Sequence, residues 1–128
     1  MTASGLPGVE NPARAQLNWI LNCQGCHQAD ASGSAGGAPN MAGVMARFLR
    51  VEGGREYLGR VPGVAHAPLS DDALAELLNW SLYTFDRDHV PENFNPYTAD
   101  EVRRLRAAPL ISEAASKREE LVELFVHE

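Results

Sequence analysis

The two cysteines of the chain stand three positions apart, and a histidine directly follows the second, in Cys23-Gln24-Gly25-Cys26-His27. Thiols at this spacing can form thioether bonds to the two vinyl groups of a haem, while the adjacent imidazole binds its iron. Closely spaced cysteines also occur in structural zinc centres and in redox-active dithiols. The remaining residues of the chain distinguish these three kinds of site.

A zinc centre and a redox dithiol both fit the sequence poorly. A structural zinc ion needs four ligands, so two of the other histidines would have to complete the site, and no two of them stand at ligand spacing. A thioredoxin-type dithiol usually lies near a βαβ pattern, and the chain shows no convincing strand. The sequence therefore favours one covalently bound haem c, with Cys23 and Cys26 as its attachment points and His27 as its proximal ligand.

Helical signals lie on both sides of this motif and predict an all-α fold. Asn11 as N-cap and Pro12 at the first helical position begin a helix that runs into Cys23. Ser70 caps a second helix, whose apolar residues recur at helical spacing as far as Phe85. Further helices are predicted over 41–51, 98–108 and 113–126, with a short helical turn over 55–58 and loops over 28–40, 59–68 and 86–97.

Composition excludes several kinds of partner. The 128 residues carry a net charge of −6, with a single lysine, and the excess of acids lies in the second half of the chain. Nucleic-acid binding would require a basic patch, so no nucleic-acid partner is expected. No apolar run approaches the roughly 20 residues of a membrane span, so no membrane span is expected.

Residues 11–85 resemble the class I c-type cytochromes. The resemblance rests on four features in order, which are an N-terminal helix running into CQGCH, a loop of small residues, the stretch Ala38-Pro39-Asn40-Met41-Ala42-Gly43, and a last helix 69–85 with Trp80. It implies that the Pro39 carbonyl accepts a hydrogen bond from His27 and that Met41 packs against the haem. It also implies that the first and last helices cross, with Trp80 near Leu77, Leu78 and the Ile20 face.

The second axial ligand departs from the family pattern. Class I cytochromes usually place a methionine in the loop before the last core helix, but this loop, VPGVAHAPLSDD, has none and offers only His66. Three alternatives stay open: ligation by His66, ligation by Met45 or Met41, and an open position. A thioether ligand raises the reduction potential and a second imidazole lowers it, whereas an open position admits a small gas.

The resemblance also implies a function and a compartment. An electron carrier rather than an enzyme is expected, passing single electrons in the periplasm, with its signal peptide already removed. The expected partners are a periplasmic dehydrogenase and a terminal oxidase or reductase, met through a small interface at the haem edge with little dependence on salt. The chain could also be the cytochrome subunit of a dehydrogenase complex. The alternative from another class is a haem sensor that binds a small ligand at an open or displaceable sixth site.

The chain is predicted to divide into a haem domain, 1–85, and a C-terminal helical extension, 86–128. The extension is longer than a minimal cytochrome c needs. Its apolar residues suit a stabilising wrap on the core, and they also suit a docking surface for a partner enzyme or a second subunit.

Overall fold

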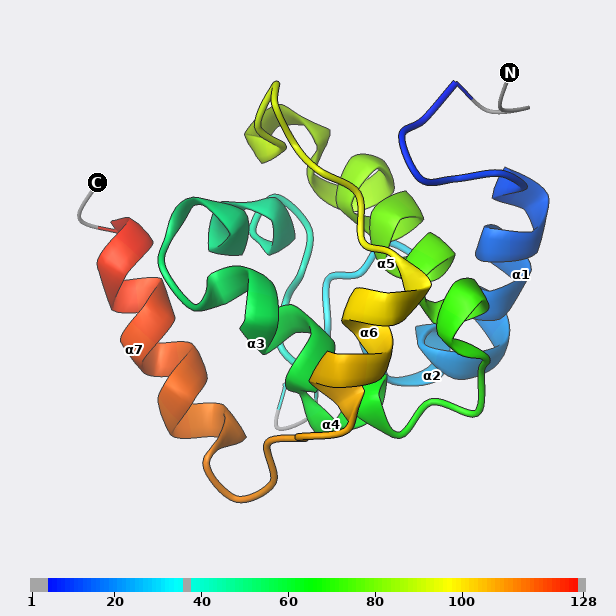
Figure 1. Ribbon diagram of the computed structural model, residues 1–128. Coiled ribbons are helices and arrows are strands. Elements are labelled where there is room, and N and C mark those ends of the chain that lie inside the picture. Colours follow the sequence, from blue (N-terminus) through cyan, green and yellow to red (C-terminus); the bar gives the residue numbers. More distant parts are fainter. Residues whose placement is uncertain (1–4, 36–37, 127–128) are drawn as a thin grey trace.

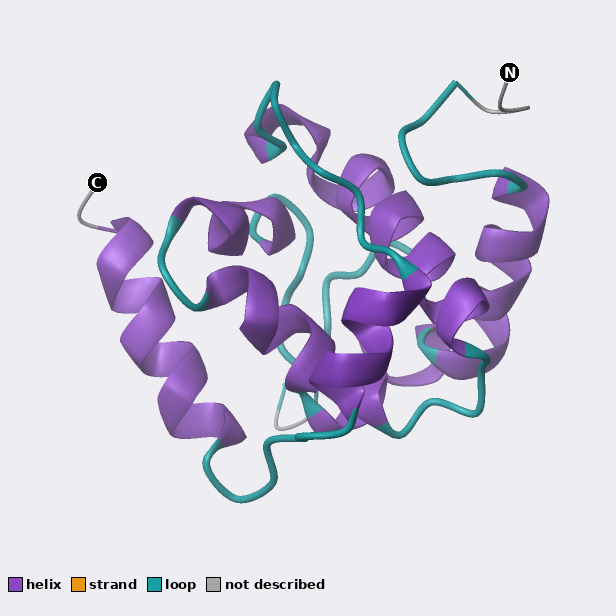
Figure 2. Ribbon diagram, in the orientation of Figure 1, coloured by secondary structure: helices purple, strands orange, loops and turns teal. Residues whose placement is uncertain are grey.

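A computed structural model describes residues 5–35 and 38–126, and in these residues the chain forms helices and loops without a strand (Figures 1 and 2). The all-α prediction is confirmed. The elements in order are α1 (Pro12–Asn22), α2 (Gln24–His27), the 3-10 helix η1 (Met45–Arg50), α3 (Gly54–Arg60), α4 (Pro62–Ala65), α5 (Asp71–Asp86), the 3-10 helix η2 (Arg87–His89), α6 (Ala99–Arg106) and α7 (Ala114–Val126).

The predicted helix starts are confirmed where a polar side chain caps them. The Asn11 side chain accepts a hydrogen bond from the Arg14 backbone N–H at 3.0 Å, and Pro12 follows at the first helical position of α1. Ser70 caps α5 and Thr98 caps α6 in the same way. Each cap satisfies a backbone donor that the first turn of a helix leaves without a partner.

Several segments differ from the prediction, among them the turn expected over 55–58, which is the longer α3, and the loop expected over 86–97, which contains η2. The helix expected over 41–51 is the shorter η1, because the Asn40 side chain binds the Ala42 N–H at 3.1 Å and Gly43 adopts a left-handed backbone with φ of 71°. Both features form turns that an α-helix cannot include. The loop expected over 59–68 contains α4, which begins at Pro62.

Helices α1 and α5 cross, and aromatic side chains pack between them. The ring centroids of Trp19 and Trp80 lie 6.4 Å apart, and those of Trp19 and Phe85 lie 4.6 Å apart. The expected role of Ile20 is wrong, because its side chain is 45% exposed, and Leu78 packs in the other cluster of the core. Trp19 shares the inward face of α1 with Ala15, one helical turn earlier, which turns Ile20 toward solvent. The crossing forms the Trp19 cluster, whose buried members are Val9, Ala15, Trp19, Ala31, Leu77 and Trp80.

A larger cluster occupies the other side of α5. It joins η1, α3 and α5 to the C-terminal segment, so that α7 covers η1 and α3 at the side of the molecule away from α1 (Figure 1). The segment after residue 85 contributes Tyr97, Val102, Leu110, Leu121 and Phe125 to this cluster. None of the helices in the described ranges combines the length and apolar character that a membrane span requires.

Candidate haem site

The Cys-x-x-Cys-His motif begins at Cys23, between α1 and α2, and its other four residues form α2. Cys23 ends α1 by donating its backbone N–H to the Trp19 carbonyl at 2.9 Å, and the N–H groups of Cys26 and His27 both return to the Cys23 carbonyl. The side chain of Cys23 is half-buried and that of Cys26 is exposed, and neither forms a disulfide. The helical turn therefore holds two thiols and an imidazole within five consecutive residues.

The Cys23 thiol does not have the properties of a redox-active cysteine. Burial, assisted by the neighbouring Cys26, raises the pKa of Cys23 to about 11. Catalytic dithiols depend on a thiol whose pKa is lowered, because the thiolate is the reactive form. At neutral pH this thiol is protonated, which argues against the dithiol interpretation.

The His27 imidazole is half-buried beside Trp19, at 5.8 Å between ring centroids. Burial lowers its pKa, and the nearby backbone of Pro39 opposes that change in part. Proline has no N–H, so the group that acts on the ring is the Pro39 carbonyl. The ring is therefore neutral at pH 7, the form that binds a metal through a nitrogen lone pair.

Two buried side-chain nitrogens test whether these residues fit a haem. Among the described residues, His27 Nδ1 and Trp19 Nε1 are buried without a hydrogen-bond partner. Buried polar atoms are rarely left in this state, and a role in binding a prosthetic group is one reason for it. A metal-binding histidine normally donates its second N–H to a carbonyl, and Pro39 supplies one beside His27. The residues present therefore fit the group that the motif predicts.

Gly33 brings Pro39 to His27, and sequence reasoning did not single it out. Its N–H donates to the His27 carbonyl at 2.9 Å, and its φ is 78°. A Cβ on Gly33 would collide with the carbonyl of Ala38 and with the backbone of Pro39. The only signal in the sequence is a glycine within a loop of small residues, which does not reveal this contact.

Met41 and Leu69 line the boundary between the two clusters. Both are half-buried, and both pack against the Trp19 cluster and against the larger cluster. Cys23 also packs against the Trp19 cluster. The cysteine, the segment after Pro39 and the loop before α5 therefore all reach the Trp19 cluster.

The candidates for the sixth ligand lie in different surroundings. His66 directly follows α4 with its side chain exposed, in the loop that reaches the Trp19 cluster through Leu69. Met45 is 4% exposed in the larger cluster, and Met41 lies at the boundary of the two. The structure thus puts Cys23, His27 and Met41 against the Trp19 cluster and Pro39 beside His27, whereas His66 lies on a loop that reaches this cluster through Leu69.

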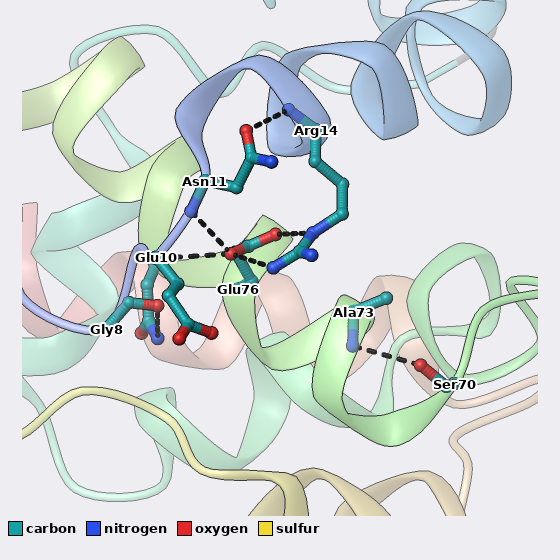
Figure 3. Close-up of polar contacts among 8 residues, drawn as sticks. Gly8, Glu10, Asn11, Arg14, Ser70, Ala73 and Glu76 are labelled. Carbon is teal, nitrogen blue, oxygen red and sulfur yellow. Dashed lines mark hydrogen bonds and ion pairs between the residues drawn. The ribbon is translucent and has the colours of Figure 1, made fainter. Parts of the chain in front are cut away.

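A buried carboxylate fixes the start of α1 on α5 (Figure 3). Glu76 accepts hydrogen bonds from the backbone N–H groups of Glu10 and Asn11 at 3.2 and 3.0 Å, and the Arg14 guanidinium donates two more at 2.8 Å each. The hydrogen bond from Arg14 is the largest cause of the lowered pKa of Glu76, followed by its backbone and charge contacts, while burial opposes them. In the sequence, Glu76 is visible only as an acid within the buried stretch of α5. The residues that it binds lie more than 60 positions earlier.

Comparisons with known proteins give relatives from one species. Cytochrome c-552 of Thermus thermophilus is 36% identical over 106 aligned positions, which cover 69% of this chain and 81% of the relative. A further cytochrome c-552, from a defined strain of Thermus thermophilus, is also 36% identical, over 69% of this chain and 72% of the relative. No family model matches the chain. No solved structure matches it either.

The sequence identity to cytochrome c-552 agrees with the kind of protein that the motif and the helices indicate. The all-α fold, the Cys-x-x-Cys-His turn and the aromatic helix crossing occur in a chain that covers most of a cytochrome c at more than a third identity. The chain belongs to the class I monohaem c-type cytochromes, electron carriers that hold one haem c covalently.

Proposed function

We propose that this cytochrome carries single electrons in the periplasm between a dehydrogenase or reductase and a terminal acceptor. The observation that carries the proposal is the α2 turn, where two unpaired thiols stand beside a neutral imidazole and the Pro39 carbonyl. Attachment of haem c takes place on the exported side of bacterial membranes, as the family implies. This supports the periplasm as the compartment.

Cys23 and Cys26 would hold the haem through thioethers, with His27 as the proximal ligand. When bound, the haem iron supplies a reversible one-electron couple. The chain's own residues would orient and shield that group: the Pro39 carbonyl beside His27 would accept the N–H of its ring, and the Trp19 cluster would keep water from one side. Met41 contributes an apolar surface beside it. Fixed surroundings of this kind limit the rearrangement that accompanies each electron transfer.

His66 is the proposed sixth ligand. Met45 is buried in the larger cluster, and the backbone N–H of the next residue, Ala46, is held by the Asp86 carboxylate at 2.9 Å. Met41 lies at the cluster boundary, where a methionine commonly fills apolar space. His66 is exposed on a loop that reaches the Trp19 cluster through Leu69, and Cys23 packs against the same cluster, which supports an imidazole in the position where the family usually has methionine.

The proposed contact surface for redox partners is the outer face of α1. Leu17, Ile20 and Leu21 are 53%, 45% and 69% exposed, and their spacing puts them on one side of the helix that leads into Cys23. Arg14 is the only permanently charged residue between positions 11 and 29, and Glu76 pairs with it. An apolar and nearly neutral face suits a partner whose docking surface is also apolar.

Electron transfer to membranes of the source bacterium tests this proposal. Reoxidation of the reduced holoprotein by those membranes should depend little on salt, and Leu21→Gln should slow it several-fold. Ile111→Gln is the matched control, because Ile111 is 71% exposed but lies far along the chain from the motif, between α6 and α7. Reoxidation by ferricyanide should be equal in all three proteins. Equal loss in both variants, or a steep fall of the rate with salt, would contradict the proposed surface.

A further inference from the structure

One side chain of the C-terminal extension, Arg106 at the end of α6, binds the backbone of the His66 loop at several points. Its guanidinium donates to three carbonyls of that loop: Nε to Ala65 at 3.2 Å, Nη2 to Ala67 at 2.6 Å and Nη1 to Leu69 at 2.8 Å. Nη1 also contacts the Asp71 carboxylate at 3.2 Å. The Arg106 side chain is only 17% exposed, so these contacts lie in a largely buried setting.

The three carbonyls belong to every second residue of the loop, and the carbonyl of His66 is not among them. Ala65 and Ala67 are buried at 6% and 8% exposure, and Leu69 packs against both clusters, whereas the side chain of His66 is exposed. Arg106 thus holds the backbone on both sides of His66 without contacting its imidazole through any of these bonds. The planar guanidinium, with five donors in a fixed arrangement, is suited to holding several carbonyls in one geometry.

We propose that Arg106 is a positioning residue for the sixth ligand, so that α6 of the C-terminal extension forms part of the haem site. The inference rests on the proposed ligation by His66. A ligand on a loop already held in place loses less conformational freedom when it binds, and its bond is correspondingly stronger. Without the guanidinium, the loop leaves the iron more often.

Binding of carbon monoxide to the reduced holoprotein measures how often the sixth position opens. Where His66 closes the position, carbon monoxide binds only after this ligand has left, so its rate reports the open fraction. Arg106→Ala should raise the rate at least tenfold, which corresponds to about 1.4 kcal/mol. Arg106→Lys keeps the charge but not the planar set of donors, and should raise the rate less. Arg104→Ala is the control, because Arg104 is exposed on the same helix and makes only a 3.4 Å contact with the Asp100 carbonyl.

A second measurement separates positioning from general loss of stability. Hydrogen exchange of the holoprotein should quicken at the amides of His66, Ala67 and Leu69 in Arg106→Ala, while the amides in α1 and the middle of α5 keep their protection. Equal quickening throughout the protein would overturn the inference. If Arg106→Ala does not yield holoprotein, Arg106→Lys provides the test. A carbon monoxide binding rate of Arg106→Lys equal to that of the wild type would then overturn the positioning role.

His66→Ala in the same assay distinguishes failure of the inference from failure of the proposed ligand. If this variant binds carbon monoxide at once while Arg106→Ala matches the wild type, His66 is the ligand and Arg106 does not position it. If His66→Ala leaves both the ferric spectrum and the carbon monoxide rate unchanged, the proposed ligand is wrong and the positioning role falls with it. Electron carriage by the haem held at His27 would stand in either case.

Discussion

At the scale of single residues, the proximal side of the site depends on a close approach between two backbone segments. Gly33 lies against Ala38 and Pro39, and this contact brings the Pro39 carbonyl to His27. Gly33 and Gly43 both have a left-handed backbone, with φ of 78° and 71°. Only Gly33 has backbone atoms where a Cβ would stand, whereas a Cβ on Gly43 would meet nothing within 4 Å.

This difference allows a matched pair of substitutions. Gly43→Ala should cost about 1–2 kcal/mol of unfolding free energy, because it only forces alanine into a left-handed conformation. Gly33→Ala should cost more and should also shift the reduction potential, because it displaces Pro39 from His27 and alters the basicity of that ligand. Denaturant unfolding and voltammetry of the two holoproteins provide the measurements. Equal losses of stability with unchanged potentials would show that Gly33 has no role at the site.

At the scale of elements, the site depends on how α1 is fixed against α5. The Trp19 cluster forms the centre of the crossing, and Glu76 anchors the start of α1 through its backbone and Arg14 (Figure 3). Since Cys23 ends α1, a displacement of that helix would displace the attachment point of the haem. The stability of the packing between α1 and α5 is therefore expected to depend on pH through the Glu76 carboxylate.

Glu76→Gln should destabilise the protein by about 1.5–3 kcal/mol at pH 7, the range for hydrogen bonds that involve a charged group. The pKa of Glu76 is lowered in the folded protein from an ordinary value of 4.5. The carboxylate's contribution is thus complete above pH 4.5 and is lost as the pH falls through the lowered value. Unfolding free energies of the wild type and the variant should converge in acid. Glu119→Gln, exposed on α7, should match the wild type at every pH. A Glu76→Gln difference that persists unchanged in acid would contradict the ionic role of Glu76.

The sequence predicted the parts of the fold and of the candidate site that local chemistry determines. Asn11, Ser70 and Thr98 cap helices through their own neighbours, and the haem motif lies within five consecutive positions. The arrangement of those parts could not be predicted, because it depends on distant contacts. The choice of Trp19 over Ile20 at the crossing depends on the rotation of α1 against α5. The carbonyls that Arg106 holds lie about 40 positions away in the chain.

At the scale of the whole molecule, the segment after residue 85 is part of the main core. Leu121 and Phe125 of α7 are each 2% exposed, and Phe125 contacts Phe48 with ring centroids 5.0 Å apart. The Arg47 guanidinium adds a hydrogen bond to the Phe125 carbonyl at 3.0 Å. These contacts favour the stabilising wrap over a helix that waits for a partner, while Leu124 on the outer face of α7 stays 55% exposed.

Two leucines of α7 test this interpretation. Leu121→Ala should lower the unfolding free energy by about 2–5 kcal/mol, as expected when a fully buried leucine leaves a cavity. Leu124→Ala should change it by less than about 0.5 kcal/mol, because the side chain is exposed. Denaturant titration of the holoproteins gives both values. If the Leu121 substitution is as mild as the Leu124 substitution, α7 does not stabilise the core.

The residue that closes the second face of the iron decides both the proposed His66 ligation and the positioning role of Arg106. The most direct measurement is the absorption spectrum of the ferric holoprotein, recorded for the wild type and for His66→Ala, followed by addition of carbon monoxide to the reduced forms. Ligation by His27 and His66 predicts no weak far-red band of the kind that thioether ligation gives. It also predicts slow carbon monoxide binding by the wild type and immediate binding by the variant. A far-red band that persists in His66→Ala would contradict the assignment by showing that Met41 or Met45 binds the iron, and immediate binding by the wild type would show an open site.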